Sequence, residues 1–94
     1  MLSIEELRVK AVSDLDDYIN QVENKQLVFA PSFDKTLALI ELLSEELNSD
    51  TLNYFLTFIQ GKLENQIGSE LYAYPTFLTD LQQLRQIVCN IVGK

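Results

Sequence analysis

The chain has 94 residues, of which 47% are hydrophobic and 22% are charged, and its formal net charge is −7. This length and composition are typical of one globular unit, so we interpret residues 1–94 as a single helical domain. Seven Lys and Arg residues are too few for the basic stripe that direct nucleic-acid binding or an acidic membrane surface requires, and we expect neither partner.

Targeting and membrane signals are not evident in the sequence. The first residues lack a basic segment followed by an apolar run. No apolar stretch approaches the roughly 20 residues of a membrane span. The one cysteine, Cys89, has no partner for an internal disulfide, which fits a reducing compartment. We therefore expect a cytoplasmic protein.

The first helix is expected to begin after Ser3, because Ser3 and Glu6 have the spacing of a capping box. Apolar residues then recur at helical spacing as far as Val22. Ala30 precedes Pro31, and proline disfavours helical angles in the residue before it. We therefore expect the second helix to begin near Ser32.

Three further helices are expected along the rest of the chain. The second helix ends at the polar connector 48–50, where Ser49 or Asp50 caps the third. Gly68 is suited to end the third helix. The fourth begins at Pro75 or Thr76 and ends at Gly93. Segments 26–30 and 71–74, beside the two prolines, are the only extended candidates.

Residues 27–33 (Leu-Val-Phe-Ala-Pro-Ser-Phe) are echoed 44 residues later by residues 71–77 (Leu-Tyr-Ala-Tyr-Pro-Thr-Phe). A fixed period of this size indicates a repeated supersecondary unit. The sequence predicts an all-α fold, a four-helix antiparallel bundle built from two similar αα-hairpins.

Catalytic chemistry has little support in this sequence. Histidine is absent, which removes the usual general base and the nucleophile systems that depend on it. The three glycines are too far apart for a phosphate-binding loop. Asp14 and Asp17 form one carboxylate cluster that could contact Mg²⁺ or Ca²⁺, but a solvated helix face is the favoured interpretation. We expect no catalytic residues, no cofactor and no metal.

Several apolar residues lie off the core stripes of the second and third helices. They are predicted to form one patch, with a glycine that permits close helix approach: Leu39, Leu42, Tyr54, Phe58 and Gly61. Three interpretations remain open: burial inside the chain, a homodimer seam, or a docking surface for another protein. Tyr and Phe are frequent anchors of protein interfaces.

The segment Gly68-Ser69-Glu70-Leu71-Tyr72-Ala73-Tyr74-Pro75 resembles the Gly-Ser-Asp-Leu-x-Tyr-Tyr-Pro segment of the colicin nuclease immunity proteins. In this chain Ala73 stands at the first family tyrosine, and Tyr72 is displaced by one position. The resemblance covers residues 68–75 only, and it implies that Tyr72 and Tyr74 contact a basic partner.

The sequence thus favours a non-enzymatic, acidic helical module that binds a protein, either a second copy of itself as a homodimer or a regulatory partner. The alternative is an inhibitor or immunity-type protein that neutralises a basic enzyme such as a nuclease toxin. An acidic surface attracts basic partner surfaces in either case.

Overall fold

The computed structural model describes residues 3–66, 68 and 70–90, and within them the chain forms four helices. The helices are α1 (Ile4–Glu23), α2 (Ala30–Leu47), α3 (Asp50–Leu63) and α4 (Phe77–Asn90). Two short strands, β1 (Val28–Phe29) and β2 (Leu71–Tyr72), and a 3₁₀ turn, η1 (Glu64–Gln66), lie in the connections.

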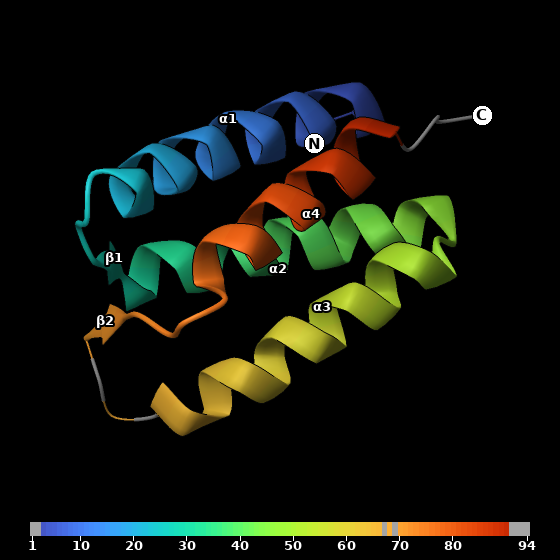
Figure 1. The fold of residues 1–94 in the computed structure, drawn as a ribbon. Helices are drawn as coiled ribbons and strands as arrows, with labels where there is room; N and C mark the ends of the chain where they lie inside the picture. The colour runs from blue at the N-terminus through green and yellow to red at the C-terminus, as the bar shows by residue number, and fades with distance from the viewer. Residues whose placement is uncertain (1–2, 67, 69, 91–94) are drawn as a thin grey trace.

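The helices alternate in direction along the chain (Figure 1). Helix α1 packs against α2 and α4, and α3 packs against the same two helices from the other side. The strands lie at the end of the bundle where α1 ends and α2 begins. The prediction of a mostly helical domain of four antiparallel helices is confirmed.

Two helix starts follow from local sequence as predicted. The Ser3 hydroxyl accepts a hydrogen bond from the Glu6 amide at 3.1 Å, and the Glu6 carboxylate accepts one from the Ser3 amide at 3.2 Å. The Ser49 hydroxyl accepts from the Leu52 amide at 3.2 Å and caps α3. These side chains satisfy amides that the first turn of a helix leaves without a partner.

Other helix ends differ from the sequence-based expectation. Helix α2 begins at Ala30 rather than near Ser32, because Pro31 lies in its first turn, where no backbone donor is needed. Helix α4 begins at Phe77, later than expected, and its predicted end at Gly93 lies outside the described residues. Gly68 has a φ of +87°, but α3 ends earlier and passes into η1.

The extended candidates beside the prolines form a two-stranded antiparallel ribbon, in which Val28 pairs with Tyr72 and Phe29 with Leu71. The Ala30 amide adds a hydrogen bond of 2.8 Å to the Glu70 carbonyl. The ribbon therefore joins the α1–α2 corner to the segment that leads into α4.

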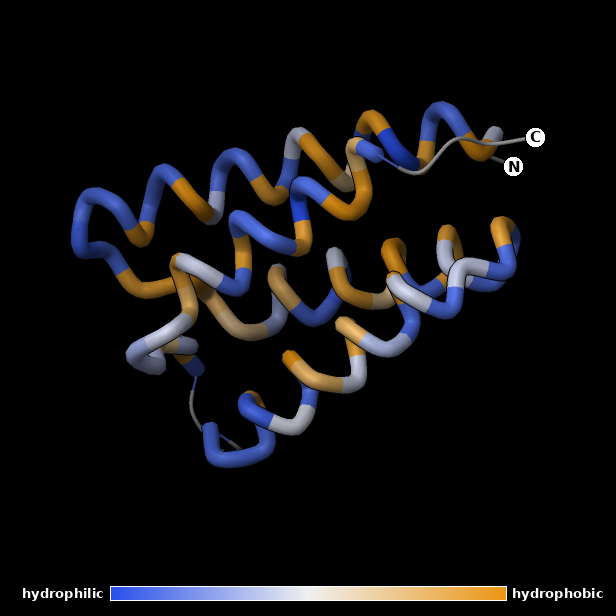
Figure 2. Tube along the Cα trace, turned by 45° about the vertical axis from the view of Figure 1, so that its right-hand side comes forward, coloured by the Kyte–Doolittle hydropathy of each residue, from blue (hydrophilic) through white to orange (hydrophobic). Residues whose placement is uncertain are grey.

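The core is formed by one apolar stripe from each helix together with Val28 of β1, and hydrophobic and hydrophilic stretches alternate along the helices (Figure 2). Phe33 is fully buried near the ribbon. Its ring makes edge-to-face contacts with Tyr18, Tyr72 and Phe77 at centroid distances of 5.2, 6.0 and 5.3 Å. This aromatic cluster fixes the end of the bundle where the ribbon lies.

Candidate functional site

The most exposed large apolar side chain on the described surface belongs to α3. Tyr54 is 81% exposed, and Phe58, one turn later, is 44% exposed. Residues four apart on a helix lie side by side, so Asp50, Tyr54, Phe58 and Lys62 form one row along α3, which we call the α3 ridge. Neighbouring exposed aromatic side chains are a feature of protein interaction surfaces.

Two shallow hollows flank Tyr54. One is lined by α3 alone, including Asp50, Thr57 and Phe58. The other is lined by residues of α3 and by Ile87 of α4. The α3 ridge therefore lies on the side of α3 that turns toward α4.

A lysine supports the base of the α3 ridge. The Lys62 ammonium lies 4.3 Å from the centroid of the Phe58 ring and donates to Asp80 of α4 at 3.1 Å. It also donates to the Thr76 hydroxyl at 2.7 Å. Because the ammonium is anchored on α4, the Phe58 ring has a fixed cationic neighbour.

The members of the predicted patch differ in burial. Leu39 is half-buried against the core, whereas Leu42 is 45% exposed on α2. No α2 residue lines either hollow beside Tyr54. Gly61 is exposed, and a Cβ added there would meet nothing within 4 Å. Packing within the described chain therefore does not require glycine at this position.

The two tyrosines of the 68–75 segment use their hydroxyls inside the molecule. Tyr72 donates to Asp34 and Tyr74 donates to Asp80, both at 2.9 Å. Burial, followed by the hydrogen bond to Asp80, raises the pKa of Tyr74 well above its ordinary value of 10.0. Burial and the hydrogen bond to Asp34 also raise the pKa of Tyr72. Both rings are half-buried, so only part of each is open to a partner.

Sequence reasoning missed Asp80, a carboxylate that is only 4% exposed. One of its oxygens accepts hydrogen bonds from Lys62, Tyr74 and Thr76. The sequence feature that points to this buried carboxylate is an acidic residue between Phe77 and Leu81 on the apolar stripe of α4. A charge on a buried stripe requires partners, and here they link α3 to α4.

A second polar contact, also missed, links α1 to α2. Thr36 is 3% exposed, and its hydroxyl lies 3.0 Å from the Tyr18 hydroxyl. The same hydroxyl donates to Asp14 at 3.2 Å, and Asp14 lies 3.5 Å from the Lys10 ammonium. The sequence suggested Asp14 and Asp17 as possible contacts for Mg²⁺ or Ca²⁺. Of these two residues, Asp14 thus has partners within the protein. In the part of the chain that the structure describes, no group of three or more Asp, Glu, Cys or His side chains is arranged to hold a metal ion.

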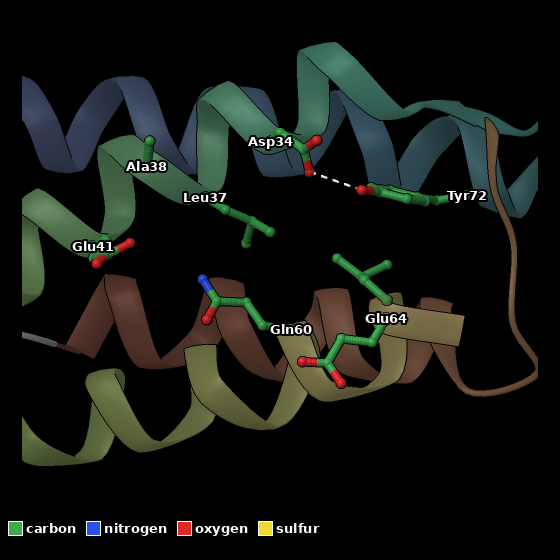
Figure 3. A pocket seen from close by; sticks show the side chains of 8 residues that line it. Asp34, Leu37, Ala38, Glu41, Gln60, Glu64 and Tyr72 are labelled. Atoms are coloured by element: carbon green, nitrogen blue, oxygen red, sulfur yellow. Dashed lines mark hydrogen bonds between the residues drawn. The ribbon is translucent and has the colours of Figure 1, made fainter. Parts of the chain in front are cut away.

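A groove runs between α2 and α3 on the side that does not carry the ridge (Figure 3). Its floor is apolar and includes the buried side chains of Leu37 and Leu63. Its rim carries the carboxylates of Asp34, Glu41 and Glu64. No lysine or arginine lines this groove, so its charge is negative.

No helix within the described residues is both long and apolar enough to cross a membrane. No protein-family model matches the chain, and no curated protein or solved structure shows significant similarity to it. Inferences about function therefore start from the α3 ridge and from the groove.

Proposed function

We propose that this protein is a non-enzymatic interaction module that self-associates through the α3 ridge. The observation that carries the proposal is the 81% exposure of Tyr54 beside the exposed ring of Phe58. Burying two aromatic rings against a partner removes apolar surface from water, and aromatic residues dominate the energetics of many interfaces.

The order of residues along the α3 ridge favours a second copy of the chain as the partner. In an antiparallel pair of α3 helices centred on residue 56, Tyr54 of each copy faces Phe58 of the other. The same register places Asp50 opposite Lys62 in both directions, while Lys62 keeps its pair with Asp80 of its own chain. Gly61 would then allow the partner helix to approach closely.

The test replaces the two aromatic residues by charged ones, Tyr54→Glu with Phe58→Glu. Sedimentation velocity should show a concentration-dependent dimer for the wild-type protein and a monomer for the double variant. Each anchor is expected to contribute about 2 kcal/mol or more to association. Far-UV circular dichroism should show unchanged helicity, because both side chains are exposed.

Two controls separate the α3 ridge from other apolar surface. Val9→Glu changes a side chain on α1 that is 58% exposed, and Leu42→Glu changes the exposed member of the predicted patch on α2. Both variants should leave the dimer intact, because neither side chain lines the hollows beside Tyr54. A wild-type protein that remains monomeric throughout the concentration range would refute self-association.

The alternative function, neutralisation of a basic enzyme, draws its support from a different surface. The groove between α2 and α3 is acidic, and Tyr72 lines it. A basic nuclease or another cationic enzyme is the class of partner that such a surface attracts. This alternative predicts heterologous binding that weakens strongly as salt is added.

We also propose that the chain consists of two αα-hairpins related by the 44-residue repeat. In support, the ribbon pairs Val28 with Tyr72, and these two residues are 44 positions apart. Phe33 and Phe77, also 44 apart, contact each other at 5.3 Å. Contacts between equivalent residues are what a two-fold axis through the ribbon and the aromatic cluster would produce.

The buried polar contacts follow the same spacing. Thr36 and Asp80 are 44 apart and both are buried. Tyr18 bonds to Thr36, and Lys62, 44 residues after Tyr18, bonds to Asp80. Superposition of residues 4–46 on residues 48–90 in a crystal structure tests the repeat, which requires that one rotation of about 180° relates them.

A further inference from the structure

The proposed repeat relates the α1–α4 contact to the α2–α3 groove. The α1–α4 contact contains an arginine, whereas the equivalent position in the groove is a glutamate. On α4, Arg85 donates to both carboxylate oxygens of Asp16 on α1. Counted 44 residues away, Arg85 corresponds to Glu41 on α2, and Asp16 corresponds to Gln60 on α3. Both of these residues line the groove.

The acidic side chains on this rim differ in how they are engaged. Asp34 accepts a hydrogen bond from Tyr72. Within the described part of the chain, the side chains of Glu41 and Glu64 make no hydrogen bond or ion pair, and both are exposed. Figure 3 shows Glu41 on α2 and Gln60 on α3 reaching into the same space. Two carboxylates without partners among the described residues and the side-chain amide of Gln60 thus line a groove that contains no cation of its own.

We propose that this groove docks an arginine presented by a basic segment of a partner protein. The guanidinium lies at the acidic rim, where its planar set of donors matches the carboxylate of Glu41 or of Glu64, with the Gln60 amide beside it. The methylene stem of the arginine lies along the apolar floor beside Leu37 and Ala38. The Arg85–Asp16 pair shows the same chemistry within this chain.

Charge complementarity selects this occupant over a second copy of the chain. Each copy carries a net charge of −7, so a second acidic groove would be repelled, whereas a basic segment is attracted. The inference rests on the proposed role in protein interaction and on the 44-residue correspondence, but it uses a surface distinct from the α3 ridge.

The test uses a defined probe, a capped alanine-based peptide with one arginine between two leucines. Two matched peptides carry lysine or the neutral citrulline in place of arginine. Titration followed by amide chemical shifts in NMR should place binding at residues 34–41 and 60–64. The citrulline peptide is expected to bind about tenfold more weakly or not at all, because it lacks the charge.

The decisive comparison uses two double variants that change the net charge by the same amount at different places. Glu41→Gln with Glu64→Gln should weaken binding of the arginine peptide about tenfold. Glu45→Gln with Glu46→Gln, on exposed positions of α2 outside the groove, should change it less than about twofold. Equal losses in the two pairs would reduce the effect to general charge attraction and overturn the proposal.

Two further outcomes also decide the matter. Equal binding of the lysine peptide would overturn the assignment of arginine, and shifts centred on α3 near Tyr54 would overturn the assignment of the groove. The variant Tyr54→Glu with Phe58→Glu should still bind the arginine peptide. Failure of the groove is therefore distinguishable from failure of self-association through the α3 ridge.

Discussion

Replacing Lys62 by methionine tests how strongly the buried carboxylate of Asp80 depends on its cation. Methionine keeps an unbranched apolar stem next to Phe58 and removes only the ammonium. The Asp80 side chain is 5% exposed and that of Lys62 is 31% exposed. The change therefore leaves a carboxylate in the interior with the hydroxyls of Tyr74 and Thr76 as its remaining donors.

The expected loss in the free energy of unfolding lies between two limits. Removing one partner of a fully buried ion pair costs about 3–5 kcal/mol, whereas an exposed pair contributes about 0–1 kcal/mol. Lys62 is partly exposed and two hydroxyl donors remain, so we expect a loss of about 2 kcal/mol. For a domain of this size, that loss lowers Tm by roughly 10 °C.

The assay is urea unfolding followed by far-UV circular dichroism, with the slope of the transition compared between variants. Lys35→Met is the matched control, because Lys35 is exposed on α2 and makes no ion pair or hydrogen bond among the described residues. It should change stability by less than about 0.5 kcal/mol. The variant Lys62→Met with Asp80→Asn should recover part of the loss, since no unpaired charge remains. A Lys62→Met protein as stable as the control would refute the argument.

Three further predictions concern stability. The raised pKa of Tyr74 keeps its phenol protonated in the folded state. Its contribution to the free energy of unfolding is therefore complete below about pH 10 and is lost above it. Alkaline unfolding curves should show a smaller loss of stability in Tyr74→Phe. Thr36→Val leaves the Tyr18 hydroxyl without its partner and should cost about 1–2 kcal/mol in chemical denaturation, part of which Tyr18→Phe restores in the same background. Ser49→Ala removes the cap of α3 and should cost about 1 kcal/mol by thermal unfolding, with a loss close to zero contradicting the capping role.

Features set by near neighbours in sequence were predictable. The capping box of Ser3 and Glu6 spans one turn of helix, and the cap of Ser49 reaches three residues ahead. The apolar stripe of each helix follows from the 3.6-residue period alone. Helix α2 begins earlier than the sequence predicts, because the first turn of a helix accepts Pro31.

Features that join distant segments were not predictable in the same way. Lys62 and Asp80 are 18 residues apart, and their contact depends on how α3 packs against α4. Helical spacing predicts that Leu39 and Tyr54 lie off the core stripes, but it does not say which neighbouring helix covers each side. Leu39 is half-buried, whereas Tyr54 is open to solvent. The groove has no sequence motif, since its two walls come from separate helices.

The proposed repeat allows the α3 ridge to be compared with the equivalent positions of the first hairpin. The comparison indicates whether the fold requires the aromatic residues of the ridge. Counted 44 residues back, Tyr54 and Phe58 correspond to Lys10 and Asp14 on α1, which form an ion pair at 3.5 Å. Under the proposed repeat, the first hairpin folds with polar side chains at these two positions, so the fold would not require the aromatic pair of α3. The graft Tyr54→Lys with Phe58→Asp should keep the Tm within about 3 °C of the wild-type value and should abolish the dimer in sedimentation. A graft that unfolds the protein would show that the two rings serve the core, and a graft that still dimerises would remove the α3 ridge from the interface.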